Sequence, residues 1–311
     1  MKKKKIIFMG TADFSAAVLQ MLIDEHYNVV AVVSQPDRPV GRKKVLQPTL
    51  VKQLALQYHI PCIQPSNIKC DYEDILDYKP DLIISAAYGQ IIPSAILDYP
   101  SLGCINVHAS LLPKLRGGAP VHYAIMEGMD KTGITIMYMA KKMDAGDMLA
   151  KVETPITKTD TVSILYDRLT HLGASLLKEI LPDFMAGKLV PIKQNEDEAT
   201  FAPTITREKE HVLFNRTCYE VDCHIRGLND WPVGYAIYND QAIKLWSGEE
   251  TTIQSNVDPG TIVKTDSTGI YIACNDYLYC LKEIQIPGKK KILVKDYMNG
   301  KNIFELNTKF M

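Results

Sequence analysis

Short runs of apolar residues alternate with amphipathic segments in the first part of the chain. The apolar runs, which are typical of parallel strands buried on both faces, lie at 6–9, 29–34, 82–86 and 104–107. Segments with apolar residues at helical spacing lie at 13–24, 48–58 and 161–186. Strands that alternate with helices favour an α/β domain with a parallel sheet. We therefore predict an N-terminal Rossmann-like domain built on an open parallel sheet.

The pattern changes after residue 187. Residues 188–210 are polar and contain two prolines and an acidic run, so we interpret them as a linker. After a short helical segment, five short strands are predicted at 234–238, 242–246, 261–264, 270–274 and 277–286. Short strands separated by turn residues favour a small OB-like β-barrel, a fold that suits a nucleic-acid partner. We thus expect domains at 1–189 and 209–311, joined by a linker at 190–208.

The composition is that of an ordinary globular protein. The 311 residues are 46% hydrophobic and 23% charged, which fits about two domains. The formal net charge is −1, so a polyanionic partner would have to meet a local basic patch. The seven cysteines are scattered and contain no Cys-x-x-Cys, which fits the reducing cytoplasm. No apolar stretch approaches membrane-spanning length. We therefore expect a cytoplasmic protein that binds no membrane.

Polar residues at the ends of two predicted strands are the candidate catalytic groups. Asn106 and His108 lie at the C-terminal end of the strand at 104–107 and share one face, because side chains alternate along a strand. In an open α/β sheet, ligands bind at that end of the strands. Asp144 follows another apolar run, at 134–139, in a loop that contains glycine. An amide, an imidazole and a carboxylate can polarise a carbonyl, stabilise an oxyanion and accept a proton, although three such residues also fit an ordinary polar loop.

Two further segments leave predicted strands at the same end of the sheet. The loop at 35–48 contains four cations among three prolines and a glycine, and we expect it to be irregular. It lacks the Gly-Lys-Ser/Thr ending of a P-loop. The turn at 10–14 has a single glycine, so it is not a dinucleotide fingerprint, and we expect Thr11 or Asp13 to cap the helix that follows.

The segment from Asn106 to Gly117 reads Asn-Val-His-Ala-Ser-Leu-Leu-Pro-Lys-Leu-Arg-Gly, and Asp144-Ala-Gly-Asp-Met follows it. Together these motifs resemble the folate-dependent formyltransferases, which transfer a formyl group from 10-formyltetrahydrofolate to an amine. Three outer motifs are similar to the members of this family that formylate methionine attached to initiator tRNA. They are Gln-Pro-Asp-Arg-Pro-x-Gly-Arg at 35–42, Ile-Arg-x-x-Asn-x-Trp-Pro at 225–232, and Pro-Gly-Lys-Lys at 287–290.

The resemblance implies roles for individual residues. Asn106 and His108 would stabilise the oxyanion of a tetrahedral intermediate, and Asp144 would hold His108 and help to remove protons from the attacking ammonium; no metal is needed. The implied folate-binding residues are Gln90, Ile91, Ile92, Ser110, Leu111, Leu112 and Pro113. The implied tRNA-binding residues of the basic loop are Arg38, Arg42, Lys43 and Lys44. Lys289, Lys290 and Lys291 form either a phosphate-facing patch or a solvated turn.

Two departures from the family pattern and two rival functions remain. Lys43 stands where a further glycine usually follows the arginine, and Leu115 stands where an aromatic residue is frequent. The chain could instead formylate a small amine, such as a ribonucleotide or an amino sugar, or bind nucleic acid without catalysis. The barrel and the basic loop argue against the first alternative, and the set of Asn106, His108 and Asp144 argues against the second. We expect a monomer.

Overall fold

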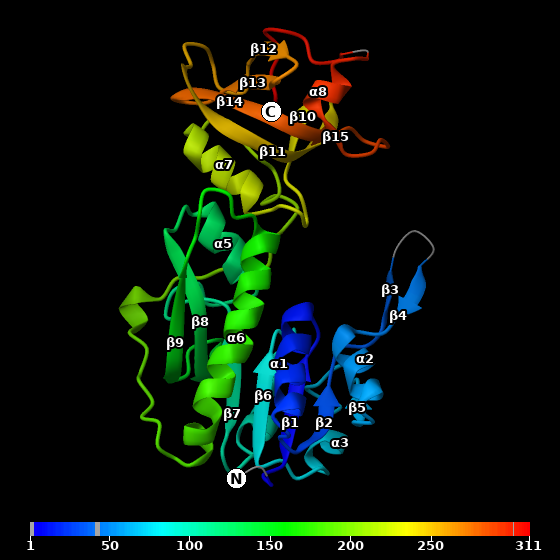
Figure 1. The fold of residues 1–311 in the computed structure, drawn as a ribbon, viewed down its shortest axis with the longest axis vertical. Coiled ribbons are helices and arrows are strands. Elements are labelled where there is room, and N and C mark those ends of the chain that lie inside the picture. Colours follow the sequence, from blue (N-terminus) through cyan, green and yellow to red (C-terminus); the bar gives the residue numbers. More distant parts are fainter. Residues whose placement is uncertain (1–2, 41–43, 301) are drawn as a thin grey trace. The chain divides into compact units, whose positions relative to one another are not determined.

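The chain forms two compact units in the computed structural model, which describes residues 3–40, 44–300 and 302–311 (Figure 1). The first unit comprises 1–120, 132–154 and 166–203, and the second comprises 121–131, 155–165 and 204–311. The long helix α6 (Val162–Met185) therefore begins in the second unit and continues into the first. No helix in the described part of the chain is both long and apolar enough to cross a membrane.

A seven-stranded sheet is the centre of the first unit. Its strands, in spatial order, are β5 (Cys62–Ile63), β2 (Val29–Val33), β1 (Ile6–Gly10), β6 (Leu82–Ala86), β7 (Cys104–His108), β8 (Lys131–Tyr138) and β9 (Met148–Pro155). Neighbouring strands from β5 to β7 are parallel, and β8 runs antiparallel to β7. The α/β fold class predicted from the apolar runs is confirmed, with an antiparallel extension on one side of the sheet.

Helices cover both faces of this sheet. On one face lie α1 (Asp13–Asp24) and α6, which stand in front of the strands in Figure 1. A Cβ on Gly173 of α6 would lie 3.0 Å from Phe14 and 3.1 Å from Val107, so a larger residue would push these side chains aside where the helix approaches the sheet. On the other face, α3 (Glu73–Leu76) and α4 (Ser94–Leu97) pack with Cys104 in one apolar cluster. Alternation along β7 therefore turns Asn106 and His108 away from α6.

Two local expectations for the first unit are wrong. The residue that caps α1 is Ala12, which offers no side-chain bond, because Thr11 instead donates its hydroxyl to the Tyr88 carbonyl at 2.9 Å. The basic loop contains a hairpin, β3 (Arg38–Val40) and β4 (Val45–Gln47), which precedes α2 (Leu50–Gln57). The β-branched and apolar residues of these two segments pair across the hairpin, and its central residues 41–43 lie outside the described part of the chain.

The second unit is an antiparallel β domain, and the helices α5 (Pro120–Met126) and α7 (Cys218–Arg226) belong to it. Its strands are β10 (Tyr235–Tyr238), β11 (Gln241–Gln254), β12 (Ile262–Asp266), β13 (Gly269–Ala273), β14 (Tyr277–Gln285) and β15 (Ile292–Leu293), and a short helix, α8 (Val294–Tyr297), follows them. The spatial order is β10-β11-β14-β13-β12, with β15 on β14. β11 extends well beyond the predicted 242–246, because Gly248 and the polar residues after it continue the pairing with β14.

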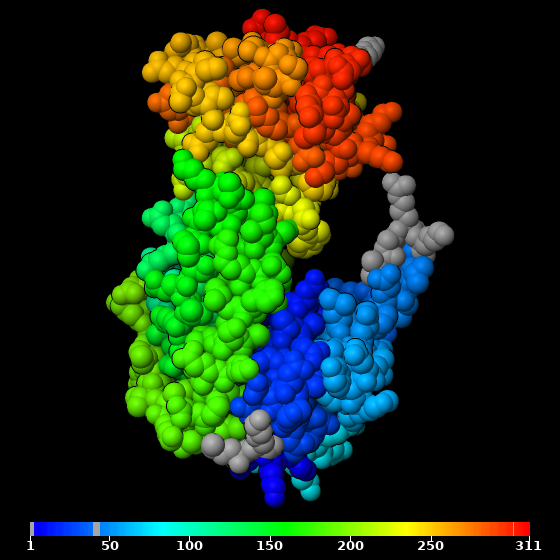
Figure 2. Space-filling model, viewed as in Figure 1, coloured from blue at the N-terminus to red at the C-terminus, as the bar shows by residue number. Residues whose placement is uncertain are grey.

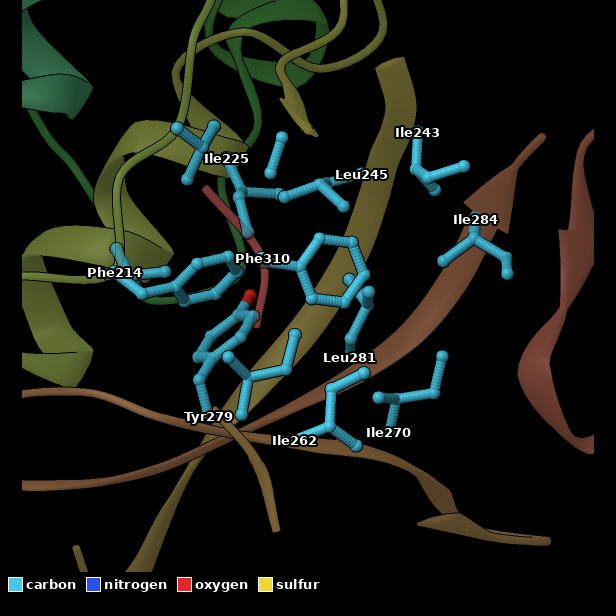
Figure 3. Packing of buried hydrophobic residues seen from close by; sticks show 14 of the residues in the cluster. Phe214, Ile225, Ile243, Leu245, Ile262, Ile270, Tyr279, Leu281, Ile284 and Phe310 are labelled. Atoms are coloured by element: carbon cyan, nitrogen blue, oxygen red, sulfur yellow. The ribbon is translucent and has the colours of Figure 1, made fainter. Parts of the chain in front are cut away.

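The C-terminal segment joins the two edges of this sheet. Met311 exchanges two backbone hydrogen bonds with Ile237 of β10, at 2.7 and 2.8 Å, while Ile262 of β12 pairs with the backbone at 307–308. The same segment places Phe310 in the core (Figure 3). The centroid of its ring lies 5.1 Å from that of Tyr238. The chain end thus closes the sheet around an apolar interior, and the predicted C-terminal β domain is confirmed.

Candidate active site

The end of β7 positions the first two candidate residues. Asn106 lies opposite Ser85 of β6 and Met137 of β8, and it is half-buried. Its side-chain amide makes no hydrogen bond to any residue in the described ranges. His108 follows two positions later and is 6% exposed. The strand therefore offers one uncommitted amide beside one nearly enclosed imidazole.

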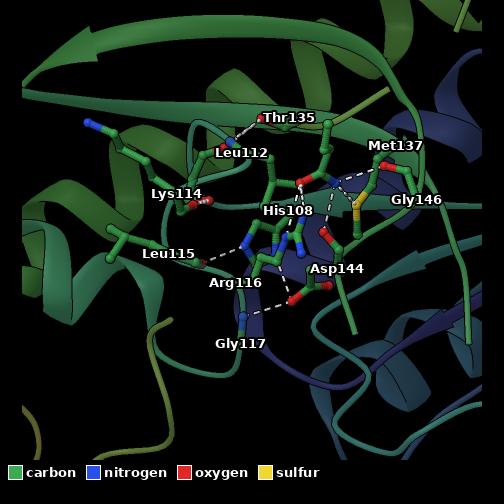
Figure 4. Close-up of polar contacts among 12 residues, drawn as sticks. His108, Leu112, Lys114, Leu115, Arg116, Gly117, Thr135, Met137, Asp144 and Gly146 are labelled. Carbon is green, nitrogen blue, oxygen red and sulfur yellow. Dashed lines mark hydrogen bonds and ion pairs between the residues drawn. The ribbon is translucent and has the colours of Figure 1, made fainter. Parts of the chain in front are cut away.

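The imidazole of His108 is held between a carbonyl and a carboxylate (Figure 4). Its Nε2 lies 3.1 Å from the carbonyl oxygen of Leu115, which can only accept, so Nε2 carries a hydrogen. Its Nδ1 lies 3.7 Å from Oδ2 of Asp144, too far for a hydrogen bond. Nδ1 is thus the ring nitrogen that remains available to a ligand, and a proton on it would face the carboxylate.

The backbone conformation of Asp144 and a hydrogen bond to its side chain together fix the position of its carboxylate. The residue has φ 52°, in the left-handed region, and its Oδ2 accepts the backbone N–H of Gly117 at 2.8 Å. Its side chain is 14% exposed. A Cβ on Gly146 would lie 1.9 Å from the carbonyl oxygen of Tyr138, so this position requires glycine. The loop is consequently tight, and it directs the carboxylate to both Gly117 and His108.

Arg116 connects this loop to residues far along the chain. Its side chain is 1% exposed, and its guanidinium donates to Oε1 of Gln194 at 2.8 and 3.1 Å and to the carboxylate of Glu196 at 2.8 and 3.2 Å. Arg116 and then Lys142 lower the pKa of Glu196 to about 2. The amide of Gln194 in turn donates to the carbonyls of Asp144 and Gly146, each at 2.8 Å. A buried arginine therefore positions the glutamine that holds the Asp144 loop.

Residues interpreted as a linker thus belong to the site. Besides Gln194 and Glu196, Thr200 accepts the backbone N–H of Leu115 at 2.9 Å, and Ala202 exchanges backbone bonds with the segment around Arg116. The polar composition of this segment is that of a linker. Its role in supporting the site could not be predicted, because its hydrogen-bond partners lie about 80 positions earlier in the sequence. The one available signal was Arg116 itself, directly after the apolar Leu115, because an arginine needs acceptors once it is buried.

The residues after β7 form a closed turn. Thr135, fully buried on β8, donates to the carbonyl of Ser110 at 2.7 Å and accepts the N–H of Leu112 at 3.1 Å. The hydroxyl of Ser110 donates to the Lys114 carbonyl at 2.7 Å, and Lys151 contacts the carbonyl of Leu112. Leu112 and Pro113 are buried and Leu111 is half-buried. The side chain of Ser110 is therefore occupied within the turn, which leaves mainly apolar and backbone groups to meet a ligand.

The other residues implied to bind folate differ in their surroundings. The side chain of Gln90 accepts the N–H of Ile68 and donates to Gln35 and to the carbonyl of Pro65, which ties it to the segments after β2 and β5. Ile91 is 57% exposed, whereas Ile92 is 6% exposed and packs in the same cluster as Tyr88. The buried hydroxyl of Tyr88 has no partner among the described residues, and burial raises its pKa to about 12.

The cationic residues implied to bind tRNA are distributed over both units. Arg38 and Lys44 are exposed on the β3–β4 hairpin, and Arg42 and Lys43 lie outside the described residues. The turn that contains Lys289, Lys290 and Lys291 belongs to the second unit, where all three side chains are exposed.

The sequence also matches known family models. The formyl transferase model matches residues 4–181, and the model of the formyl transferase C-terminal domain matches residues 204–302. Solved structures share the fold. An N-formyltransferase from Helicobacter canadensis has a TM-score of 0.66 at 19% identity over 93% of this chain and 99% of that one. HypX from Aquifex aeolicus has a TM-score of 0.65 at 18% identity over 96% of this chain and 49% of that one. The chain belongs to the formyl transferase family and is a formyl-transferring enzyme.

Similarity to curated proteins shows to which group of the formyl transferase family the chain belongs. The methionyl-tRNA formyltransferase of Bacillus subtilis is 50% identical over 302 residues, which cover 96% of this chain and 95% of that protein. The one from Bacillus mycoides is 52% identical over 299 residues, or 95% of each chain. Within the family, the chain belongs with the methionyl-tRNA formyltransferases. The resemblance stated from the motifs is confirmed, and the alternatives of a small-amine enzyme and a non-catalytic binding protein are not supported.

Proposed function

We propose that this protein transfers the formyl group of 10-formyltetrahydrofolate to the amino group of methionine carried by initiator tRNA. The substrate assignment rests on the full-length similarity to methionyl-tRNA formyltransferases. The observation that carries the chemistry is the grouping of Asn106, His108 and Asp144 at the end of β7, with Nδ1 of His108 lying 3.7 Å from Asp144. Such a group suits acyl transfer through a tetrahedral intermediate.

The reaction begins when the methionine ammonium loses a proton and its nitrogen attacks the formyl carbon. The carbonyl oxygen then becomes an oxyanion, to which Asn106 donates its uncommitted amide N–H. When the ring of His108 carries a hydrogen on both nitrogens, it supplies a second donor through Nδ1, the ring nitrogen without a hydrogen bond. Asp144 stabilises the charged ring and receives the one proton that leaves the attacking nitrogen after the new bond has formed. Collapse of the intermediate breaks the bond to the folate N10, which takes up that proton from Asp144 and leaves as an amine.

Two hydrogen-bond donors suffice to activate a formamide carbonyl, so this mechanism requires no metal. We assign the folate pocket to Gln90, Ile91, Ile92 and the turn at 110–113, with the more accessible Ile91 and Leu111 supplying apolar contacts. Folate would then bind within the first unit alone. Segments at 194–202 support that pocket indirectly, because they hold Arg116 and the backbone beside Leu115.

We propose that the tRNA contacts are made by Arg38, Arg42, Lys43 and Lys44 of the basic loop and by Lys289, Lys290 and Lys291 in the second unit. The positive charge of all seven residues supports contacts to phosphates, as does the exposure of Arg38, Lys44 and the three lysines at 289–291. We further propose that the protein acts as a monomer in the cytoplasm, where its tRNA substrate is used. In this proposal a catalytic domain at 1–189 and a tRNA-binding domain at 209–311 are joined by a linker at 190–208, part of which also supports the site through Gln194 and Thr200.

A transfer assay with labelled 10-formyltetrahydrofolate tests this function. The expected result is rapid label transfer to charged initiator tRNA and negligible transfer to free methionine, because the latter lacks every contact made by the nucleic acid. Equal use of both acceptors, or transfer only to small amines, would contradict the proposed substrate.

A further inference from the structure

Trp231 is the most exposed aromatic side chain of the second unit. Its side chain is 70% exposed, whereas the other tryptophan, Trp246, is half-buried on β11. Tryptophan carries the largest apolar surface of any residue, so leaving it in water forgoes the free energy of burial. The catalytic arrangement at β7 does not use this residue, which lies in the motif at 225–232.

The backbone around Trp231 is held firmly despite this exposure. Asn229 donates its amide to the carbonyl of Trp246 at 2.6 Å, and Val233 donates its N–H to the carbonyl of Leu228 at 2.9 Å. The indole ring lies 6.3 Å from the ring of His122, centroid to centroid, in a tilted arrangement. His122 itself lies 2.8 Å from the carbonyl of Gly227 through Nδ1. The exposed ring is therefore presented by a fixed loop, which lowers the entropy that a bound partner must overcome.

Contacts with neighbouring residues connect two lysines to the loop that carries Trp231. Lys244 donates to the carbonyl of Pro232, the neighbour of Trp231, at 3.3 Å. Trp246, whose carbonyl holds Asn229, carries the ammonium of Lys291 over its ring at 4.5 Å. That lysine belongs to the turn between β14 and β15, which protrudes from the surface of the second unit in Figure 2.

Only some of the cations near this loop form ion pairs with acidic residues. Lys291 pairs with Glu283 at 3.2 Å, and the carboxylate of Asp230 accepts the hydroxyl of Ser163. Lys289 and Lys290 form no ion pair within the described ranges, so no carboxylate of this part of the chain competes with a phosphate for them. The surface thus combines a flat apolar ring with unpaired cations, which suits the bases and phosphates of a single strand.

We propose that Trp231 stacks on an unpaired base of RNA, while Lys244 and the turn at 289–291 contact the adjoining phosphates. The inference rests on the proposed function, because that function supplies the RNA: a tRNA, whose 3′ end is unpaired. Stacking on an aromatic residue requires an unpaired base, since the faces of paired bases inside a helix are covered by their neighbours.

Fluorescence gives a direct test, because the chain contains two tryptophans. In Trp246→Phe, all tryptophan emission comes from Trp231, and base stacking should quench it by more than half on saturation with uncharged initiator tRNA. The matched control is Trp231→Phe, in which Trp246 is the sole emitter and should change little. A short single-stranded RNA with the sequence of the tRNA 3′ end should also quench Trp231, whereas a blunt duplex of equal length should not.

Binding measurements complete the test in the otherwise natural chain. Trp231→Ala should weaken tRNA affinity by about 10- to 100-fold, and Trp231→Tyr should restore most of it. Folate affinity and the melting temperature should not change, because the side chain is exposed. The inference would be overturned if Trp231 emission did not change at saturating tRNA. It would also be overturned if the blunt duplex, or an unrelated protein added as a control, quenched this emission as strongly as tRNA does. Quenching without formyl transfer would overturn the proposed function alone, and transfer without quenching would overturn this inference alone.

Discussion

Gln194 supports the loop of Asp144, and its replacement by glutamate measures how much catalysis depends on that support. The glutamine amide donates to the carbonyls of Asp144 and Gly146 at 2.8 Å each, while its oxygen accepts from Arg116. In Gln194→Glu, an acceptor for Arg116 remains. Both donated bonds are lost, and a carboxylate oxygen faces two carbonyl oxygens instead.

The expected magnitude follows from these contacts. Each lost hydrogen bond contributes about 0.5–1.5 kcal/mol, and a carbonyl left without a partner costs about 1–3 kcal/mol when it is buried. Because Gln194 is half-buried, we expect the variant to destabilise the native conformation of the Asp144 loop by about 2–3 kcal/mol. A displacement of about 1 Å at a reacting group can reduce the rate by on the order of 10²-fold. The turnover number should therefore fall by about 10- to 100-fold.

The assay is steady-state formyl transfer with separate KM values for folate and charged tRNA. A positioning defect lowers kcat and leaves both KM values nearly unchanged. The matched control is Gln53→Glu, because Gln53 also donates to a backbone carbonyl, that of Pro48 at 3.0 Å, but does so at an exposed site on α2. That variant should retain normal turnover. If Gln194→Glu lost stability but kept its kcat, the glutamine would support the fold and not the catalytic geometry.

Three further results are expected. Burial lowers the pKa of His224 from 6.5 to about 4. As the pH falls from 6.5 to about 4, the histidine of the unfolded state is protonated first, so the free energy of unfolding should fall by up to about 3 kcal/mol. Chemical denaturation of His224→Gln should show a weaker pH dependence, and a dependence identical to that of the natural chain would contradict this. Phe310→Ala should cost about 3–5 kcal/mol of stability in urea unfolding, because the ring fills the core of the second unit at 4% exposure; a loss below about 1 kcal/mol would be inconsistent with that packing. Arg42→Ala should lower kcat/KM for charged tRNA and flatten its salt dependence without changing folate affinity; an equal loss of folate binding would show that the loop was misinterpreted.

The sequence pattern predicted the parts of the fold that depend on local periodicity. Continuous apolar runs located β1, β2, β6 and β7, and the alternation along β7 placed Asn106 and His108 at the end of the sheet on one face. The 3.6-residue period located α6 within one residue at each end. These features were accessible because buried strands and amphipathic helices impose their period on the residues themselves.

Features that depend on distant partners were not accessible. Nothing near Gln194 reveals that its amide holds the loop of Asp144, since the two lie 50 positions apart. The cap of α1 was mispredicted because Thr11 bonds to Tyr88, which lies on a different strand end. The hairpin β3–β4 was missed because its prolines and cations outweighed its few apolar residues in the local pattern. In each case a contact formed by the folded chain decided between local alternatives.

The central claim is that Asn106, His108 and Asp144 perform the chemistry, and the single-turnover rate of His108→Ala tests it most directly. Enzyme saturated with 10-formyltetrahydrofolate is mixed with limiting charged initiator tRNA, so that product release does not contribute to the observed rate. The account predicts a rate at least about 10²-fold below that of the natural enzyme, with folate binding and melting temperature unchanged. A rate within about threefold of the natural enzyme would contradict the assignment, because loss of a positioned donor at the oxyanion cannot be that small.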